Sequence, residues 1–177
     1  STWGSYKMKK STDVVLILHN EKQLRNNKHL DEGFIISYKK YTDGLVRGMK
    51  NVSNNLHVYN SPNELLTNIE KHKNDVVVSI WGVGGSRSKK ALIPSICEAS
   101  NVKYYGGDAF VQILCQSKYL SNLYATKFGI NCPKQVIVNK NNVNDLLCMV
   151  QQLKFPVIVK PSVEGESIGI SDANNRF

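Results

Sequence analysis

Residues 155–170 run Phe-Pro-Val-Ile-Val-Lys-Pro-Ser-Val-Glu-Gly-Glu-Ser-Ile-Gly-Ile, a β-branched run that ends in a lysine before a small, glycine-bearing segment. The run 157–160 predicts a buried strand whose terminal ammonium can reach a phosphate as a compact charge. Pro161 ends the strand because proline has no N–H to donate. The small residues that follow allow a backbone to fold over an anion. We therefore expect a strand, a lysine, a flexible cover and a second strand at 168–170. Such a unit binds nucleotide phosphates without a Walker motif, since G-x-x-x-x-G-K-[ST] occurs nowhere in the chain.

The composition is that of an ordinary globular protein with an excess of positive charge. The chain has 177 residues, 41% of them hydrophobic, and a formal net charge of +9. A basic chain suits anionic partners such as nucleotides or phosphorylated substrates. The basic residues are scattered, and no run exceeds two, so we expect a solvated lysine-rich surface and no nucleic-acid partner. No segment is long and apolar enough to suggest a membrane span or a signal peptide, which predicts a cytoplasmic protein without a membrane partner.

Cysteine and histidine spacing gives no indication of a metal centre. The four cysteines lie 16 to 18 residues apart without a C-x-x-C pair, so reduced thiols are the expectation. The four histidines, His19, His29, His57 and His72, share no spacing typical of a metal site or a catalytic triad. We predict no metal ligand among the residues of this chain and interpret the histidines as structural or surface groups.

The front part of the chain alternates strand and helix patterns, which predicts an α/β fold with a parallel, Rossmann-like sheet. Ser61, Pro62 and Glu64 form a capping box with proline at the first helical position. The expected strands are 13–18, 33–37, 56–59, 75–80 and 103–105, and the expected helices are a short one around 45–49, then 61–72 and 89–100.

The back part predicts a helix at 116–128, closed by Gly129, and then the opening of a small α+β lobe. That lobe would consist of a strand at 135–138, a helix at 142–153 and the strands 157–160 and 168–170. We therefore divide the chain into a leader at 1–10, a Rossmann-like domain at 11–130 and a partial lobe at 131–177. We expect residues 1–5 to be a remnant of expression outside the fold.

Four segments in register resemble the D-alanine–D-alanine ligases of the ATP-grasp superfamily. Residues 155–169 resemble that family's "LPVIVKPxxxGSSxG" segment. Residues 102–107 (Val-Lys-Tyr-Tyr-Gly-Gly), 115–118 (Cys-Gln-Ser-Lys) and 128–133 (Phe-Gly-Ile-Asn-Cys-Pro) are similar to its "PYxGS", "DK" and "GxPxP" segments. The resemblance extends from about Val76 to the C-terminus. It implies a Rossmann-like pre-ATP-grasp domain followed by the first part of the ATP-grasp lobe.

The resemblance implies that the cofactor ATP is held by Lys118 and Lys160, together with the glycine-rich cover that contains Glu164, Gly165 and Ser167. Two lysines from different segments would neutralise a triphosphate better than one. Glu166 departs from the family, which has a serine there that helps to hold the amino-acid substrate. We assign Glu166 to substrate binding, where a carboxylate would favour an amine; the alternative is a loop residue in solvent.

Two further substrate contacts are expected in the front part of the chain. Residues 81–88 correspond to the family's "HGxxGEDG" loop, but Trp81 replaces the histidine. Arg87 lies at a helix start in this loop and suits a substrate carboxylate or phosphate; a solvated basic turn is the alternative. Glu21 stands where the family has a glutamate for the substrate amino group, although the surrounding glycines and serines are missing. No catalytic residue is predicted.

The family's reaction is the ATP-dependent ligation of a carboxylate to an amine through an acyl phosphate. Its Mg²⁺ would bridge the phosphates, and the ligands for that ion are expected beyond the C-terminus of this chain. The partners would be small-molecule carboxylate and amine substrates, amino acids or peptides, and a homodimer is one possible state. We expect these 177 residues to be inactive alone. The alternatives are a non-catalytic nucleotide- or anion-binding module and another ATP-grasp branch, of the carboxylase or carbamoyl-phosphate type.

Overall fold

A computed structural model describes residues 12–27, 30, 32–82 and 86–163. The chain divides into two compact units, Ser1–Ala109 and Phe110–Phe177, and each is described by itself. The predicted domain division after residue 130 stays a prediction. Within the described residues, no helix combines the length and the apolar character needed to cross a bilayer.

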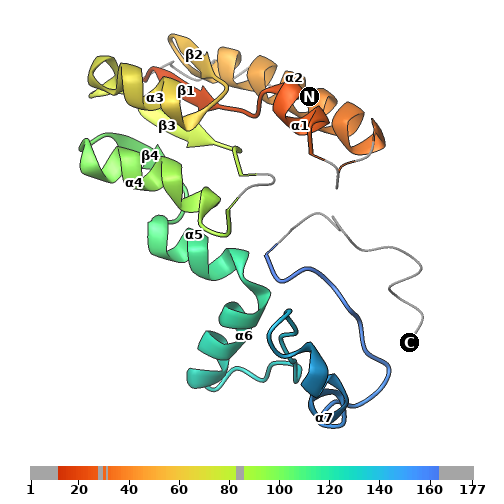
Figure 1. Cartoon of the computed structure of the whole chain (residues 1–177). Coiled ribbons are helices and arrows are strands. Elements are labelled where there is room, and N and C mark those ends of the chain that lie inside the picture. The colour runs from red at the N-terminus through yellow and green to blue at the C-terminus, as the bar shows by residue number, and fades with distance from the viewer. Residues whose placement is uncertain (1–11, 28–29, 31, 83–85, 164–177) are drawn as a thin grey trace, which may run out of the picture. The chain divides into compact units, whose positions relative to one another are not determined.

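The first unit contains a parallel sheet of four strands in the order β2-β1-β3-β4 (Figure 1). Its strands are β1 (Val14–Ile17), β2 (Leu56–Tyr59), β3 (Val76–Ser79) and β4 (Lys103–Tyr105). Because β1 lies between two neighbours and is covered on both faces, an uninterrupted apolar run suits it. Val15, Leu16 and Ile17 are accordingly fully buried. The α/β fold class and four of the five strands predicted for this part are confirmed, and β4 lies at an edge of the sheet.

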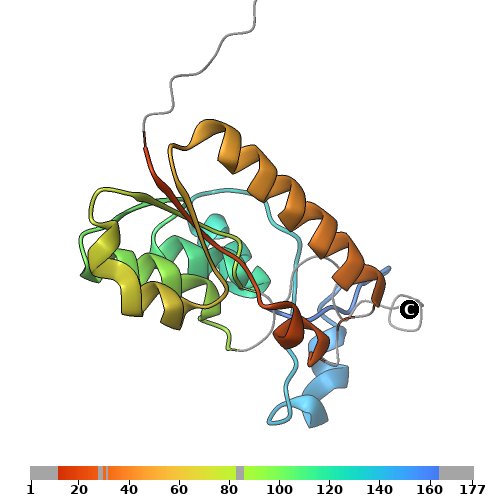
Figure 2. The same ribbon diagram turned by 90° about the horizontal axis from the view of Figure 1, so that it is seen from above.

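Helices cover both faces of this sheet. Figure 2 shows α2 along one face, with α3 and α4 on the other. The face towards α3 and α4 holds a buried cluster formed by Val15, Ile17, Leu65, Ile69, Val77, Ile93, Cys97 and Val102. The helical elements are α1 (Glu21–Arg25), α2 (Glu32–Val52), α3 (Pro62–Asn68), the 3₁₀ turns η1 (Ile69–His72) and η2 (Lys89–Ala91), and α4 (Leu92–Ala99).

The predicted Ser61 N-cap and the proline at the first turn of α3 are confirmed, whereas Glu64 reaches back to Asn60 and not to the N-cap N–H. Ser61 is the N-cap, and its hydroxyl accepts a hydrogen bond from the Glu64 N–H at 3.2 Å. The Glu64 carboxylate in turn accepts from the Asn60 N–H at 3.1 Å. One donor that the helix start leaves unpaired, the Glu64 N–H, is thereby satisfied, and the Glu64 carboxylate holds the residue before the N-cap.

The predicted strand at 33–37 is wrong, because these residues lie within the 21-residue helix α2. A short apolar run bounded by polar residues has the same pattern in a buried strand and in one turn of a helix. Here Ile35 and Thr42 are the buried positions, and their separation of seven residues corresponds to two helical turns. The predicted short helix around 45–49 is part of the same α2.

The second unit is helical in its described part, residues 110–163. α5 (Ala109–Gln116) leads into this unit, followed by α6 (Lys118–Lys127), the turn η3 (Val143–Asp145) and α7 (Leu146–Val150). Gly129 has a φ of 77° directly after the α6 C-cap Phe128, as predicted for a closing glycine. The helix expected at 142–153 exists but is shorter.

The strands predicted at 135–138 and 157–160 are wrong, since neither segment is a strand. β-branched residues favour an extended backbone, but a strand exists only where a neighbour completes the ladder. In the described residues these runs pair with no other strand. Ile158 and Val159 are 68% and 55% exposed. The third predicted strand, 168–170, lies outside the described residues.

Candidate functional site

The segment 161–163 is held against the junction between α5 and α6. Three consecutive carbonyl oxygens accept hydrogen bonds from that junction. Pro161 accepts from the Lys118 Nζ at 2.9 Å, Ser162 from the Lys118 backbone N–H at 3.0 Å and Val163 from the Gln116 side-chain amide at 3.3 Å. Two motifs that lie more than 40 residues apart in the sequence are therefore neighbours in space.

Local chemistry at the start of α6 explains why this junction can hold an extended chain. Ser117 is the N-cap, and its hydroxyl accepts from the Leu120 N–H at 3.3 Å. The first N–H groups of a helix have no partner within the helix. The Lys118 N–H is such a donor, and the Ser162 carbonyl satisfies it. Ser117 and Gln116 are both buried, so the junction is a fixed part of the unit.

Gln135 fixes the segment that follows α6, a role that no sequence pattern indicates. Its side-chain amide donates to the carbonyls of Tyr119 at 3.0 Å and Lys118 at 3.4 Å. Its oxygen accepts from the Asn122 amide at 3.3 Å. A glutamine at the start of an apparent strand carries no sequence signal for such contacts.

The charges of this site come from two lysines. Lys118 is half-buried, and its ammonium donates to the Pro161 carbonyl. Lys160, the residue immediately before that proline, is exposed. Beside them, the side-chain oxygen of Gln116 is buried and accepts no hydrogen bond within the described structure. The remaining predicted ATP and substrate residues of this stretch, Glu164, Gly165, Glu166 and Ser167, lie outside the described residues.

In the first unit, the carboxyl ends of β1 and β3 meet at His19. Its Nε2 accepts a hydrogen bond from the Gly82 N–H at 2.6 Å, and its ring stacks on Trp81 with centroids 5.1 Å apart. Its backbone N–H donates to the Tyr38 hydroxyl at 3.1 Å. Burial, followed by the positive charge of Lys89, lowers the pKa of His19 to about 4. This histidine is therefore neutral at pH 7 and acts as a hydrogen-bond acceptor at the carboxyl ends of β1 and β3.

The two substrate residues predicted in the first unit are not brought together. Glu21 is the first residue of α1 and forms ion pairs with Arg25 at 2.9 Å and Lys39 at 3.9 Å. Arg87 is exposed just before η2. Among the described residues no ion pair joins Glu21 to Arg87. Their assignment to a substrate stays a prediction.

Comparisons with known proteins agree with the motifs. The family model described as "D-ala D-ala ligase C-terminus" matches residues 124–177. A D-alanine–D-alanine ligase of Clostridium novyi is 30% identical over 125 residues, which are 67% of this chain and 35% of that protein. One from Helicobacter pylori is 30% identical over 89 residues, 50% of this chain and 25% of that protein. The chain thus spans about a third or less of the length of these relatives.

Solved structures show the same fold. The D-alanine–D-alanine ligase of Helicobacter pylori aligns with a TM-score of 0.57 at 17% identity, covering 90% of this chain and 57% of that one. The Bacillus anthracis ligase complexed with ATP aligns with a TM-score of 0.53 at 16% identity, covering 86% of this chain and 48% of that one. The resemblance suggested by the motifs is therefore confirmed: the chain is similar to the D-alanine–D-alanine ligases in sequence and has their fold.

Proposed function

We propose that this chain supplies part of the ATP site of a ligase that joins a carboxylate to an amine through an acyl phosphate. The observation that carries the proposal is the docking of 161–163 on Lys118, which unites the two segments whose lysines resemble phosphate contacts. The similarity to D-alanine–D-alanine ligases supports the reaction class. The activity is a proposal for the whole protein, since the chain spans only part of those relatives.

The two lysines suit a polyphosphate for physical reasons. The Lys118 ammonium donates to a neutral carbonyl, and a phosphate oxygen is a stronger acceptor because its charge assists the hydrogen bond. The exposed Lys160 can turn towards the same ligand at little cost. Two positive charges would offset the charge that develops on a phosphoryl group during transfer. The Gln116 oxygen offers a buried acceptor for a ligand N–H at the same segment.

The remaining roles follow the resemblance. Glu164, Gly165 and Ser167 would cover the phosphates, and Glu21, Arg87 and Glu166 would contact the amino-acid or peptide substrates. Mg²⁺ would screen the phosphates, with ligands outside this chain. A homodimer and a cytoplasmic location belong to the same proposal.

The proposal predicts that Lys160→Ala weakens ATP binding by about 10- to 100-fold. Loss of a charge-assisted hydrogen bond costs about 1.5–3 kcal/mol, and each 1.4 kcal/mol corresponds to about a tenfold change in Kd. Isothermal titration calorimetry with a non-hydrolysable ATP analogue measures the change. Lys154→Ala is the matched control, because Lys154 is also exposed and lies six residues earlier in the same segment. Equal affinities for the two variants would refute the role of Lys160.

Turnover is the second part of the test. We expect no ATP-dependent ADP release from this chain alone, whatever amino acid or peptide is supplied. Magnesium-independent, weak nucleotide binding without turnover in the longest natural form of the protein would favour the non-catalytic binding module. ADP release by these 177 residues that disappears in Lys160→Ala would contradict the expected inactivity.

A further inference from the structure

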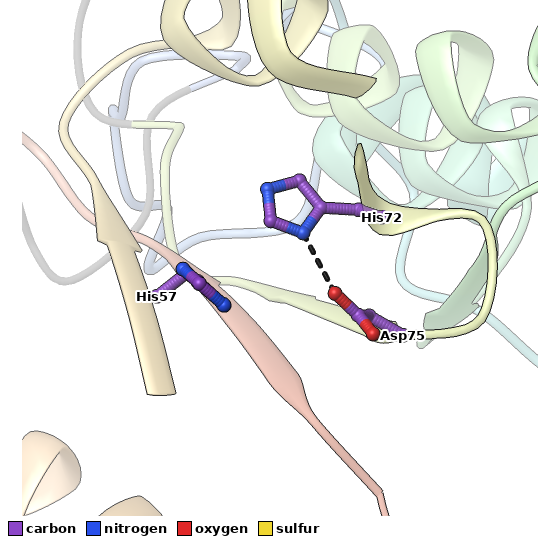
Figure 3. A group of neighbouring side chains, drawn as sticks. All are labelled: His57, His72 and Asp75. Atoms are coloured by element: carbon purple, nitrogen blue, oxygen red, sulfur yellow. Dashed lines mark hydrogen bonds and ion pairs between the residues drawn. The ribbon is translucent and has the colours of Figure 1, made fainter. Parts of the chain in front are cut away.

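Two histidines and an aspartate gather at the β2 edge of the first unit. His57, His72 and Asp75 each place one ligand-type atom so that these atoms lie within 4.8 Å of one another. Figure 3 shows the three side chains as neighbours. None of the three takes part in the proposed ATP site. Their grouping is a property of the fold, since spacing in the sequence gives no sign of it.

The sheet register explains why His57 meets His72. Residues paired across neighbouring parallel strands point to the same face, and side chains alternate along each strand. His57 pairs with Val15 and Tyr59 pairs with Ile17, and both partners belong to the cluster on the face towards α3 and α4. His57 and Tyr59 therefore point to the side where the turn η1 presents His72.

His72 is already oriented by two partners. Its Nδ1 lies 2.7 Å from the Asp75 Oδ2, and its Nε2 lies 2.8 Å from the Tyr59 hydroxyl. The ring is 2% exposed, whereas His57 is exposed and its ring centroid is 4.9 Å from that of His72. The group thus combines one fixed imidazole, one half-buried carboxylate and one imidazole that is free to adjust at the surface.

We propose that His57, His72 and Asp75 bind a divalent transition-metal ion of the Zn²⁺ class. Two imidazoles and a carboxylate suit zinc, cobalt or nickel, whereas magnesium and calcium prefer oxygen ligands throughout. Solvent at the exposed side of His57 would supply the fourth ligand. The ion would tie the edge strand β2 to η1 and to the start of β3.

Metal binding needs no change in the number of protons on His72, because only the position of its ring proton changes. In the metal-free arrangement the Nδ1 proton can donate to Asp75 while Nε2 accepts from Tyr59. For metal binding the proton moves to Nε2 and donates to the Tyr59 oxygen, since a hydroxyl can donate or accept. The Nδ1 lone pair and the Asp75 carboxylate then face the ion together, and Tyr59 keeps the ring in place as an outer partner.

The geometry requires a large movement of one exposed side chain and a small adjustment of the other two ligands. Metal–ligand distances of about 2.0–2.2 Å in a tetrahedral site set the ligand atoms roughly 3.3 Å apart. The Asp75 oxygen and the His72 Nδ1, at 2.7 Å, need only a small separation. His57 has to approach the other two, and its exposure on an edge strand leaves room for a rotamer change.

Calorimetric titration of the full chain with ZnCl₂ tests the site. Exposed Cys115 and Cys148 are first alkylated, because free thiolates also bind zinc. We expect one ion per chain, no detectable Mg²⁺ binding and a loss of affinity of at least about 10-fold in His57→Gln, since loss of even an outer partner of a ligand costs about 10- to 100-fold. His57 is exposed, so this variant leaves the core intact. His29→Gln, which removes an imidazole elsewhere in the chain, is the control and should bind like the parent.

Thermal unfolding gives an independent readout. Because the ion binds the folded state, saturating Zn²⁺ should raise the Tm of the parent chain and of His29→Gln, but not that of His57→Gln. Equal zinc affinity and equal Tm shift in His57→Gln would overturn the proposal. So would parent binding weaker than a Kd of about 1 mM, which corresponds to only about 4 kcal/mol of binding energy.

Discussion

Leu65→Ala is expected to lower the free energy of unfolding of the first unit by about 2–5 kcal/mol. Leu65 is fully buried in α3 and belongs to the cluster that packs this helix against β1 and β3. Truncation removes apolar surface from the core and leaves a cavity that the surrounding strands cannot fill. A domain has only about 5–15 kcal/mol of stability in total, so this loss is a large share.

Leu66→Ala is the matched control for this prediction. Leu66 is the next residue of the same helix but is 55% exposed, so the same truncation there should change stability by less than about 0.5 kcal/mol. Urea unfolding followed by circular dichroism, together with hydrogen exchange of the β1 amides, separates the first unit from the second. Similar losses in the two variants would show that α3 does not pack on the sheet through Leu65.

The parts of the fold that the sequence predicts well are those where local pattern and burial agree. The apolar runs that became β1 and β3 are continuous because these strands are covered on both faces. The run at 33–37 failed because five residues cannot separate a strand from a helical turn, and the packing of Ile35 decides in favour of α2. The runs at 135–138 and 157–160 failed because strand formation depends on a partner strand, which local sequence does not reveal.

Part of the candidate site could be predicted from the sequence, and part of it depends on tertiary packing. The motif order predicted that Lys118 and Lys160 belong together, and the structure brings Lys118 to the residues directly after Lys160. The polar contacts of Gln116 and Gln135 were beyond prediction, because amide side chains form them only after tertiary packing. His72 and Asp75 are three residues apart, but the approach of His57 comes from the pairing of β2 with β1.

Acidification from pH 6.5 to pH 4 is expected to lower the stability of the first unit by up to about 3 kcal/mol through His19 alone. The pKa of His19 is lowered from 6.5 to about 4, first by burial and then by Lys89. Within this window the unfolded chain binds a proton at His19 and the folded chain does not. Stability from this group is therefore complete above pH 6.5 and falls as the pH drops towards 4. Below pH 4 both states are protonated and the loss is complete.

The variant His19→Gln isolates this effect. Its side-chain oxygen can still accept from the Gly82 N–H, the contact that His19 Nε2 makes at 2.6 Å, but it cannot titrate. The difference in unfolding free energy between pH 6.5 and pH 4 should therefore be up to about 3 kcal/mol smaller than in the parent. An NMR titration of the His19 ring protons measures its pKa directly. A midpoint near the ordinary value of histidine would mean that the stack on Trp81 opens readily. The carboxyl ends of β1 and β3 would then be accessible to solvent.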